Sequence, residues 1–80
     1  MNGNLMPLSM LGMGEEARLV DVRGGYGIRQ RLSALGLNPG MKVTMVQNAM
    51  RGPIILGVMD SRIALGRGMA HKILVSKNHS

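Results

Sequence analysis

A near absence of aromatic side chains sets the narrowest limit on what this chain can fold into. Tyr26 is the only aromatic residue, and neither Phe, Trp nor Cys occurs. A chain of 80 residues buries only about 60% of the surface that its unfolded form exposes. Its core must therefore come from Leu, Ile, Val and the nine Met residues, which can fill irregular gaps. We expect one small domain, and the lack of Cys favours a reducing, cytoplasmic setting.

Short apolar stretches separated by glycine- and proline-rich turns predict a mainly β fold. The expected strands cover residues 17–22, 41–47, 54–59, 62–65 and 72–76. Ile28, Leu32 and Leu35 recur at helical spacing, which predicts a short helix over residues 28–35 that ends at Gly36. Closing such short strands into a barrel removes exposed sheet edges. The predicted fold is a small β-barrel of about five strands with one short helix after the first strand.

The two ends of the chain are predicted to lie outside this domain. We expect a mobile N-terminal segment over residues 1–6, the domain over 7–76 and a polar tail over 77–80. At the start of the domain, Ser9 is expected to cap a short helical turn. Leu8 and Leu11 on that turn would then fold back onto the core.

The net charge of +6 favours an anionic partner, which would be nucleic acid, an acidic protein face or lipid headgroups. The basic residues are spread along the whole chain, so solubility explains the charge equally well. Small barrels that bind nucleic acid usually add stacking aromatics, and Tyr26 is the only one here. We expect no nucleic-acid partner, and a nucleic-acid-binding barrel stays as an alternative.

The ionisable residues form no recognisable catalytic or metal-binding set. The four carboxylates are Glu15, Glu16, Asp21 and Asp60. The two adjacent glutamates would point to opposite faces of a strand, and no nucleophile pattern accompanies the serines. His71 and His79 lack metal-ligand spacing. We therefore predict no enzymatic activity, no catalytic residue, no metal site and no cofactor; a module that responds to a divalent ion remains a second alternative.

The densest polar cluster surrounds the predicted helix and the loop before it. Its residues are Arg23, Tyr26, Arg29, Gln30 and Arg31. Arg and Tyr are enriched at protein-binding hot spots, so this cluster is the candidate partner-binding site. The same residues would also suit a solvated helix face. The glycines at 24, 25 and 27 lack the Lys and Ser/Thr of a phosphate-binding loop, and we interpret them as a sharp strand-to-helix turn.

The stretch from the glycine-rich loop to the last predicted strand resembles the FeoA family. The elements that carry the resemblance are the helix ending in Leu35-Gly36-Leu37, the turn Pro39-Gly40, the Gly52-Pro53 turn, Arg62-Ile63-Ala64-Leu65, and Ala70 before Ile73-Leu74-Val75. This resemblance implies an SH3-like barrel with a helix inserted after the first strand. The same domain also resembles the C-terminal module of repressors of the diphtheria toxin repressor type. Because the chain starts at Met1 without room for a helix-turn-helix domain, we expect a free-standing protein.

The resemblance also implies a function and a partner. FeoA-like proteins are thought to associate with FeoB, a membrane transporter of ferrous iron with a cytosolic GTP-binding domain. We therefore expect an accessory or regulatory protein of ferrous iron transport. It would bind FeoB on the cytosolic side and be peripheral to the membrane through that partner.

Overall fold

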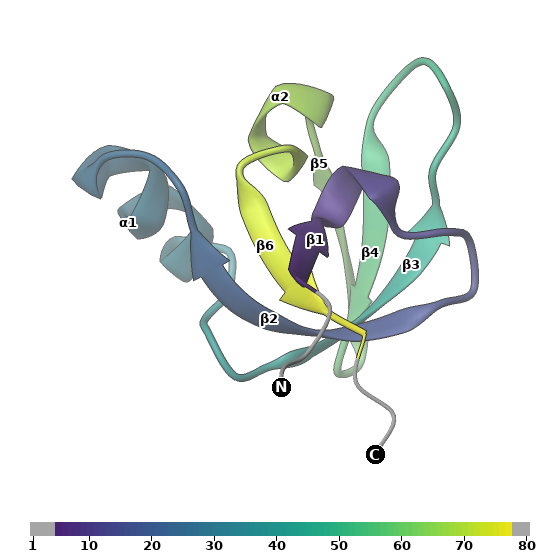
Figure 1. Ribbon diagram of the computed structural model, residues 1–80, viewed down its shortest axis with the longest axis horizontal. Helices are drawn as coiled ribbons and strands as arrows, with labels where there is room; N and C mark the ends of the chain where they lie inside the picture. The colour runs from purple at the N-terminus through teal and green to yellow at the C-terminus, as the bar shows by residue number, and fades with distance from the viewer. Residues whose placement is uncertain (1–4, 78–80) are drawn as a thin grey trace.

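The computed structural model describes residues 5–77, which form six strands, two helices and one 3-10 turn (Figure 1). In chain order the elements are β1 (Leu5–Pro7), η1 (Leu8–Met10), β2 (Glu16–Val22), α1 (Tyr26–Ala34), β3 (Lys42–Gln47), β4 (Ile54–Val58), β5 (Ser61–Leu65), α2 (Arg67–Ala70) and β6 (Ile73–Ser76). The prediction of a mainly β fold is confirmed. The structure contains one strand more than the prediction of about five, so α1 follows the second strand.

The strands form one antiparallel sheet in the order β1-β6-β2-β3-β4-β5. The last strand, β6, lies between β1 and β2 (Figure 1). No pairing joins β1 to β5 among the described residues, so the hydrogen-bond ladder of the barrel is open there. Leu5 and Met6, which are predicted to lie in the N-terminal segment, belong to β1 and pair with Ser76 and Val75. Residues 1–4 and 78–80 of the predicted ends lie outside the described part.

A β-bulge in β2 explains why its apolar pattern is imperfect. Simple alternation from Ala17 and Leu19 would place Asp21 on the core side. The register against β6 instead shifts between Leu19 and Asp21, which is how a bulge inserts one extra residue. As a result Val20 and Asp21 are both outside the core, and Val22 is buried beside Ala17 and Leu19.

Branched aliphatic side chains fill the core, and the methionines mostly do not. The buried residues are Leu8, Leu11, Ala17, Leu19, Val22, Leu32, Leu37, Val43, Met45, Ile54, Leu56, Val58, Leu65, Ala70, Ile73 and Val75. Among residues 5–77, Met45 is the only fully buried methionine, and four others are largely exposed. Met6, Met41 and Met69 pack against the core while partly buried, so the expectation that Met would help to fill the core is met only in part. Leu8 and Leu11 do fold back onto the core as expected. Ser9 does not cap η1, because the residue at the N-cap position is Pro7.

The C-terminal end of α1 is fixed by a Schellman motif. Gly36 has φ 91°, and the Leu37 amide donates to the Leu32 carbonyl at 2.9 Å. Leu32 and Leu37 are both buried, so they hold this end of the helix against the barrel. Gly36 ends the helix as predicted. Leu35, the C-cap residue, is however 44% exposed, so the third position of the predicted apolar stripe lies outside the core.

The half-buried carboxylate of Glu15 ties the turn before β2 to the residue that follows β6. Glu15 accepts a hydrogen bond from the Gly12 amide at 2.6 Å and pairs with the Lys77 ammonium at 2.6 Å. It thereby closes the turn before β2 and holds the end of β6 beside it. The hydrogen bond from Lys77, followed by the one from Gly12, lowers the pKa of Glu15 below its ordinary value.

We predict that acid weakens the fold partly through Glu15. Because the folded pKa is lowered, the contribution of Glu15 is present above the ordinary carboxyl value of 4.5 and is lost as pH falls from there through the folded pKa. Urea unfolding from pH 7 to pH 3 should show Glu15→Gln less stable than wild type at pH 7 and less sensitive to acid. The control Glu16→Gln should keep the acid sensitivity of the wild type. Equal sensitivity in all three proteins would contradict this role of Glu15.

We also predict that Leu32→Ala destabilises the protein by roughly 2–5 kcal/mol, because it leaves a cavity where a fully buried side chain was. Leu35→Ala, at the exposed end of the same helix, should cost less than about 1 kcal/mol. The measurement is the free energy of unfolding in urea. Similar values for the two variants would mean that Leu32 does not anchor α1.

Candidate protein interface

The glycine-rich loop after β2 turns the chain away from the sheet and into α1. Gly24 has φ 127°, a conformation that side chains disfavour. A Cβ atom at this position would also lie 2.8 Å from the Ile28 Cδ1 atom. The Gly25 carbonyl then accepts hydrogen bonds from the amides of Ile28 and Arg29 at 3.2 and 3.3 Å. The interpretation of these glycines as a strand-to-helix turn agrees with this geometry.

α1 is held to the barrel by few side chains. Leu32 is its only buried residue, and Ile28 packs against the core while partly buried. In Figure 1 the helix stands to one side of the sheet, beyond the end of β2. Most of its surface is therefore open to solvent, which makes α1 available to a partner.

Three of the five predicted site residues lie together on this exposed helix. Tyr26 is 74% exposed, and its hydroxyl accepts a hydrogen bond from Gln30 Nε2 at 2.9 Å. Gln30 and Arg31 line a shallow depression of about 580 Å³ along with other residues of α1. We call Tyr26, Gln30 and Arg31 the α1 surface.

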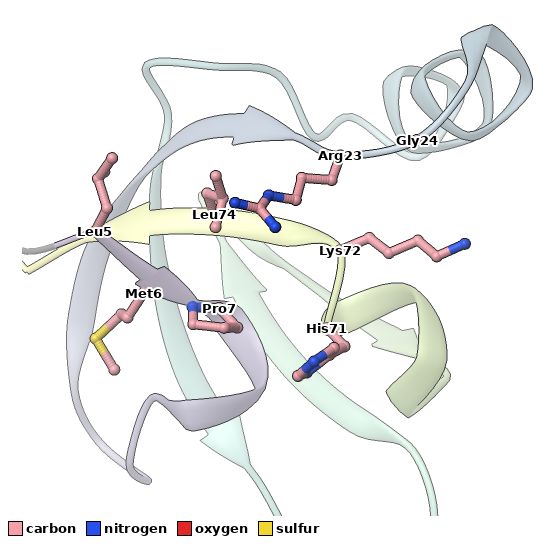
Figure 2. Close-up of a pocket in the computed structure, with 8 residues that line it drawn as sticks. All are labelled: Leu5, Met6, Pro7, Arg23, Gly24, His71, Lys72 and Leu74. Atoms are coloured by element: carbon pink, nitrogen blue, oxygen red, sulfur yellow. The ribbon is translucent and has the colours of Figure 1, made fainter.

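The other two predicted site residues point elsewhere. Arg29 forms an ion pair with Asp21 on β2, with Nη2 and Oδ1 3.3 Å apart, so part of its role is to attach α1 to the sheet. Arg23 extends from the end of β2 back over β6 (Figure 2). Its amide donates to the Lys72 carbonyl at 2.6 Å, which brings these two basic residues together.

Arg23 lines a cavity that is not among the sites predicted from the sequence. This cavity, the β1–β6 pocket, has a volume of about 540 Å³. Its lining residues are Leu5, Met6, Pro7, Arg23, Gly24, His71, Lys72 and Leu74 (Figure 2). One sequence signal pointed to it: Leu74 is an apolar residue between the inward-facing Ile73 and Val75, and so faces outward. The remaining residues meet only because β6 pairs with β1 and follows α2.

The described residues contain no group of three His, Cys, Asp or Glu side chains placed to hold a metal ion. His71 lies near Ser9, with Nδ1 and Oγ 3.1 Å apart, and His79 lies outside the described part. Neither α1 nor α2 is long and apolar enough to cross a bilayer. Three of the four carboxylates form ion pairs, which are Glu15 with Lys77, Glu16 with Lys42, and Asp21 with Arg29.

Comparison with known proteins places most of the chain in one family. The FeoA domain model matches residues 6–77. A relative from Methanocaldococcus jannaschii, named a putative Fe(2+) transport protein A, is 39% identical over 71 residues, which cover 89% of this chain and 85% of the relative. A Porphyromonas gingivalis protein, named a fusion of Fe(2+) transport protein A and the Fe(2+) transporter FeoB, is 38% identical over 77 residues. The match covers 91% of this chain and 9% of the fusion protein.

The fold is shared with solved structures. The crystal structure of an iron uptake regulatory protein (FeoA) superposes with a TM-score of 0.88 at 36% sequence identity, covering 94% of this chain and 100% of that one. A manganese-dependent transcriptional repressor gives the same TM-score, 0.88, at 12% identity, covering 98% of this chain and 44% of the repressor. The SH3-like fold implied by the resemblance to FeoA is therefore confirmed, and the likeness to the repressor is one of fold.

Proposed function

This chain belongs to the FeoA domain family, and we propose that it is an accessory protein of ferrous iron transport that binds a FeoB-type transporter through the α1 surface. The observation that carries this proposal is the fusion protein, in which sequences named for both partners share one polypeptide. Covalent linkage keeps two domains at a high effective concentration. It is most useful where the domains act together, so we infer that the separate chains also associate.

The composition of the α1 surface suits a protein interface. It combines an exposed tyrosine with an arginine, two residue types that are enriched at binding hot spots. Tyr26 and Gln30 are joined by a hydrogen bond, so these two side chains lose less freedom on binding than unpaired ones would. With a net charge of +6, the chain is attracted to an acidic face of its partner.

The protein would act by binding rather than by catalysis. General acid–base chemistry needs a carboxylate or imidazole poised beside a substrate. Here three of the four carboxylates form ion pairs with basic residues on other segments of the chain. These ion pairs give each of the three carboxylates a structural role. We infer that the protein works in the cytoplasm and reaches the membrane through its partner.

The test is an amide NMR titration of this protein with the cytosolic GTP-binding region of FeoB from the same organism, with and without nucleotide. We expect shifts to concentrate in α1, between Tyr26 and Ala34. The double variant Tyr26→Ala/Arg31→Glu should bind at least about tenfold more weakly, a loss of about 1.4 kcal/mol. Arg29 is left unchanged, because Arg29→Glu would place two carboxylates together and disturb the attachment of α1.

The matched control is Arg51→Glu, which makes the same change of charge in the exposed loop between β3 and β4. It should bind nearly as well as wild type. A similar loss in this control would show that net charge alone drives association, and unchanged binding by the double variant would reject the α1 surface. The dispersion of the amide spectrum of each variant verifies that the barrel remains folded.

A further inference from the structure

We propose that the β1–β6 pocket binds an acidic peptide segment of a protein partner, with an aliphatic side chain against Leu5 and Leu74 and a carboxylate near Arg23 and Lys72. This proposal does not rest on docking through α1. It concerns a different face of the barrel, and its ligand is defined by the chemistry of the pocket.

The first observation is an outward-facing apolar floor. Leu5 is 58% exposed, and Leu74 lies outside the core between Ile73 and Val75. The pairing of β1 with β6 sets Pro7 opposite Leu74, so these apolar groups form one surface. The pocket volume of about 540 Å³ is within the usual range for a ligand site, about 300–1,000 Å³. That space suits one or two aliphatic side chains.

The second observation is a basic rim for which the structure of residues 5–77 records no ion pair. Arg23 and Lys72 are joined through their backbones at 2.6 Å, and His71 precedes Lys72. None of the ion pairs recorded among residues 5–77 uses Arg23 or Lys72. The nearby Asp21 sits opposite Leu74 in the sheet. Its Oδ1 atom is already engaged by Arg29 at 3.3 Å and by the Val22 amide at 2.8 Å.

The two observations together favour a peptide over a small inorganic anion. Phosphate would use the basic rim and leave the apolar floor exposed to water, whereas an acidic peptide with an aliphatic residue would cover both. β1 is one of the two edge strands of the described sheet, and it contributes Leu5, Met6 and Pro7 to the pocket. Pro7 has no amide to donate, which hinders the addition of another strand along this edge. We infer that side chains, rather than main-chain pairing, carry the recognition.

The experiment is an amide NMR titration of the full chain with the synthetic peptide acetyl-Asp-Leu-Glu-Leu-amide. Two matched peptides separate the contributions. One has Asn and Gln in place of the acids, and the other has Gly in place of both Leu residues. We expect saturable shifts at Leu5, Arg23, Lys72 and Leu74 with the acidic–aliphatic peptide. Each matched peptide should bind at least about fivefold more weakly, because charge-assisted hydrogen bonds and apolar burial are both needed.

Protein variants then locate the site. Arg23→Gln and Lys72→Gln remove the charges but keep the backbone hydrogen bond between these residues, and each should weaken binding about threefold or more. Arg51→Gln, which removes a positive charge from the loop between β3 and β4, should leave binding unchanged. The α1 variant Tyr26→Ala/Arg31→Glu should also bind the peptide normally, so failure of one surface can be told from failure of the other.

Three outcomes would overturn the proposal. The first is an absence of saturable shifts in the pocket at millimolar peptide. The second is an equal loss of binding in Arg51→Gln, which would show non-specific attraction to a basic protein. The third is displacement of the peptide by an equimolar amount of inorganic phosphate with the same residues shifting, which would make the pocket a simple anion site.

Discussion

The pairing of β6 with both β1 and β2 is the constraint on which the rest of this structure depends. β6 comes last in the chain but lies between the first two strands, and its Ile73 and Val75 are fully buried. Through this strand the ends of the described chain close over the core, and Lys77 reaches Glu15 at 2.6 Å. Such non-local pairing must overcome the entropy of closing a long loop before it gains any stability. A small core without aromatic side chains provides little stabilising free energy beyond this entropic cost. The aliphatic residues of β6 are therefore essential to the fold.

Sequence patterns could predict the parts of the fold that depend on local chemistry. The strands after α1 follow from apolar runs between glycine and proline turns, and Gly36 ends the helix because its left-handed conformation allows the Schellman motif. Two features of the fold could not be predicted from such patterns. β1 has three residues and ends in Pro7, which is too short to show a period. The bulge in β2 depends on its register against β6, which local sequence does not encode.

The difference between local and long-range contacts also explains which contacts of the candidate-site residues could be predicted. Tyr26 and Gln30 are four residues apart on a helix, a spacing that places side chains together, so their contact could be predicted. Arg23 lies three residues before Tyr26, yet its side chain extends over β6 and not along α1, because its backbone pairs with Lys72. The β1–β6 pocket joins residues from positions 5–7, 23–24 and 71–74. No spacing in the sequence brings these segments together, and only the strand order reveals them.

The arrangement of the two surfaces follows from the glycine turn at 24–25. On one side of this turn Arg23 is fixed to β6, and on the other side α1 is held chiefly by Leu32. A partner that contacted both surfaces would engage α1 on one side of this turn and the β1–β6 pocket on the other. The second contact would then form at a high effective concentration, and avidity would exceed the affinity of either surface alone. Each surface by itself is small, and small interfaces are typical of weak, reversible encounters. A partner that contacted both surfaces would therefore bind more tightly and more specifically than a partner that contacted one, and the turn at residues 23–25 would set the geometry between the two contacts.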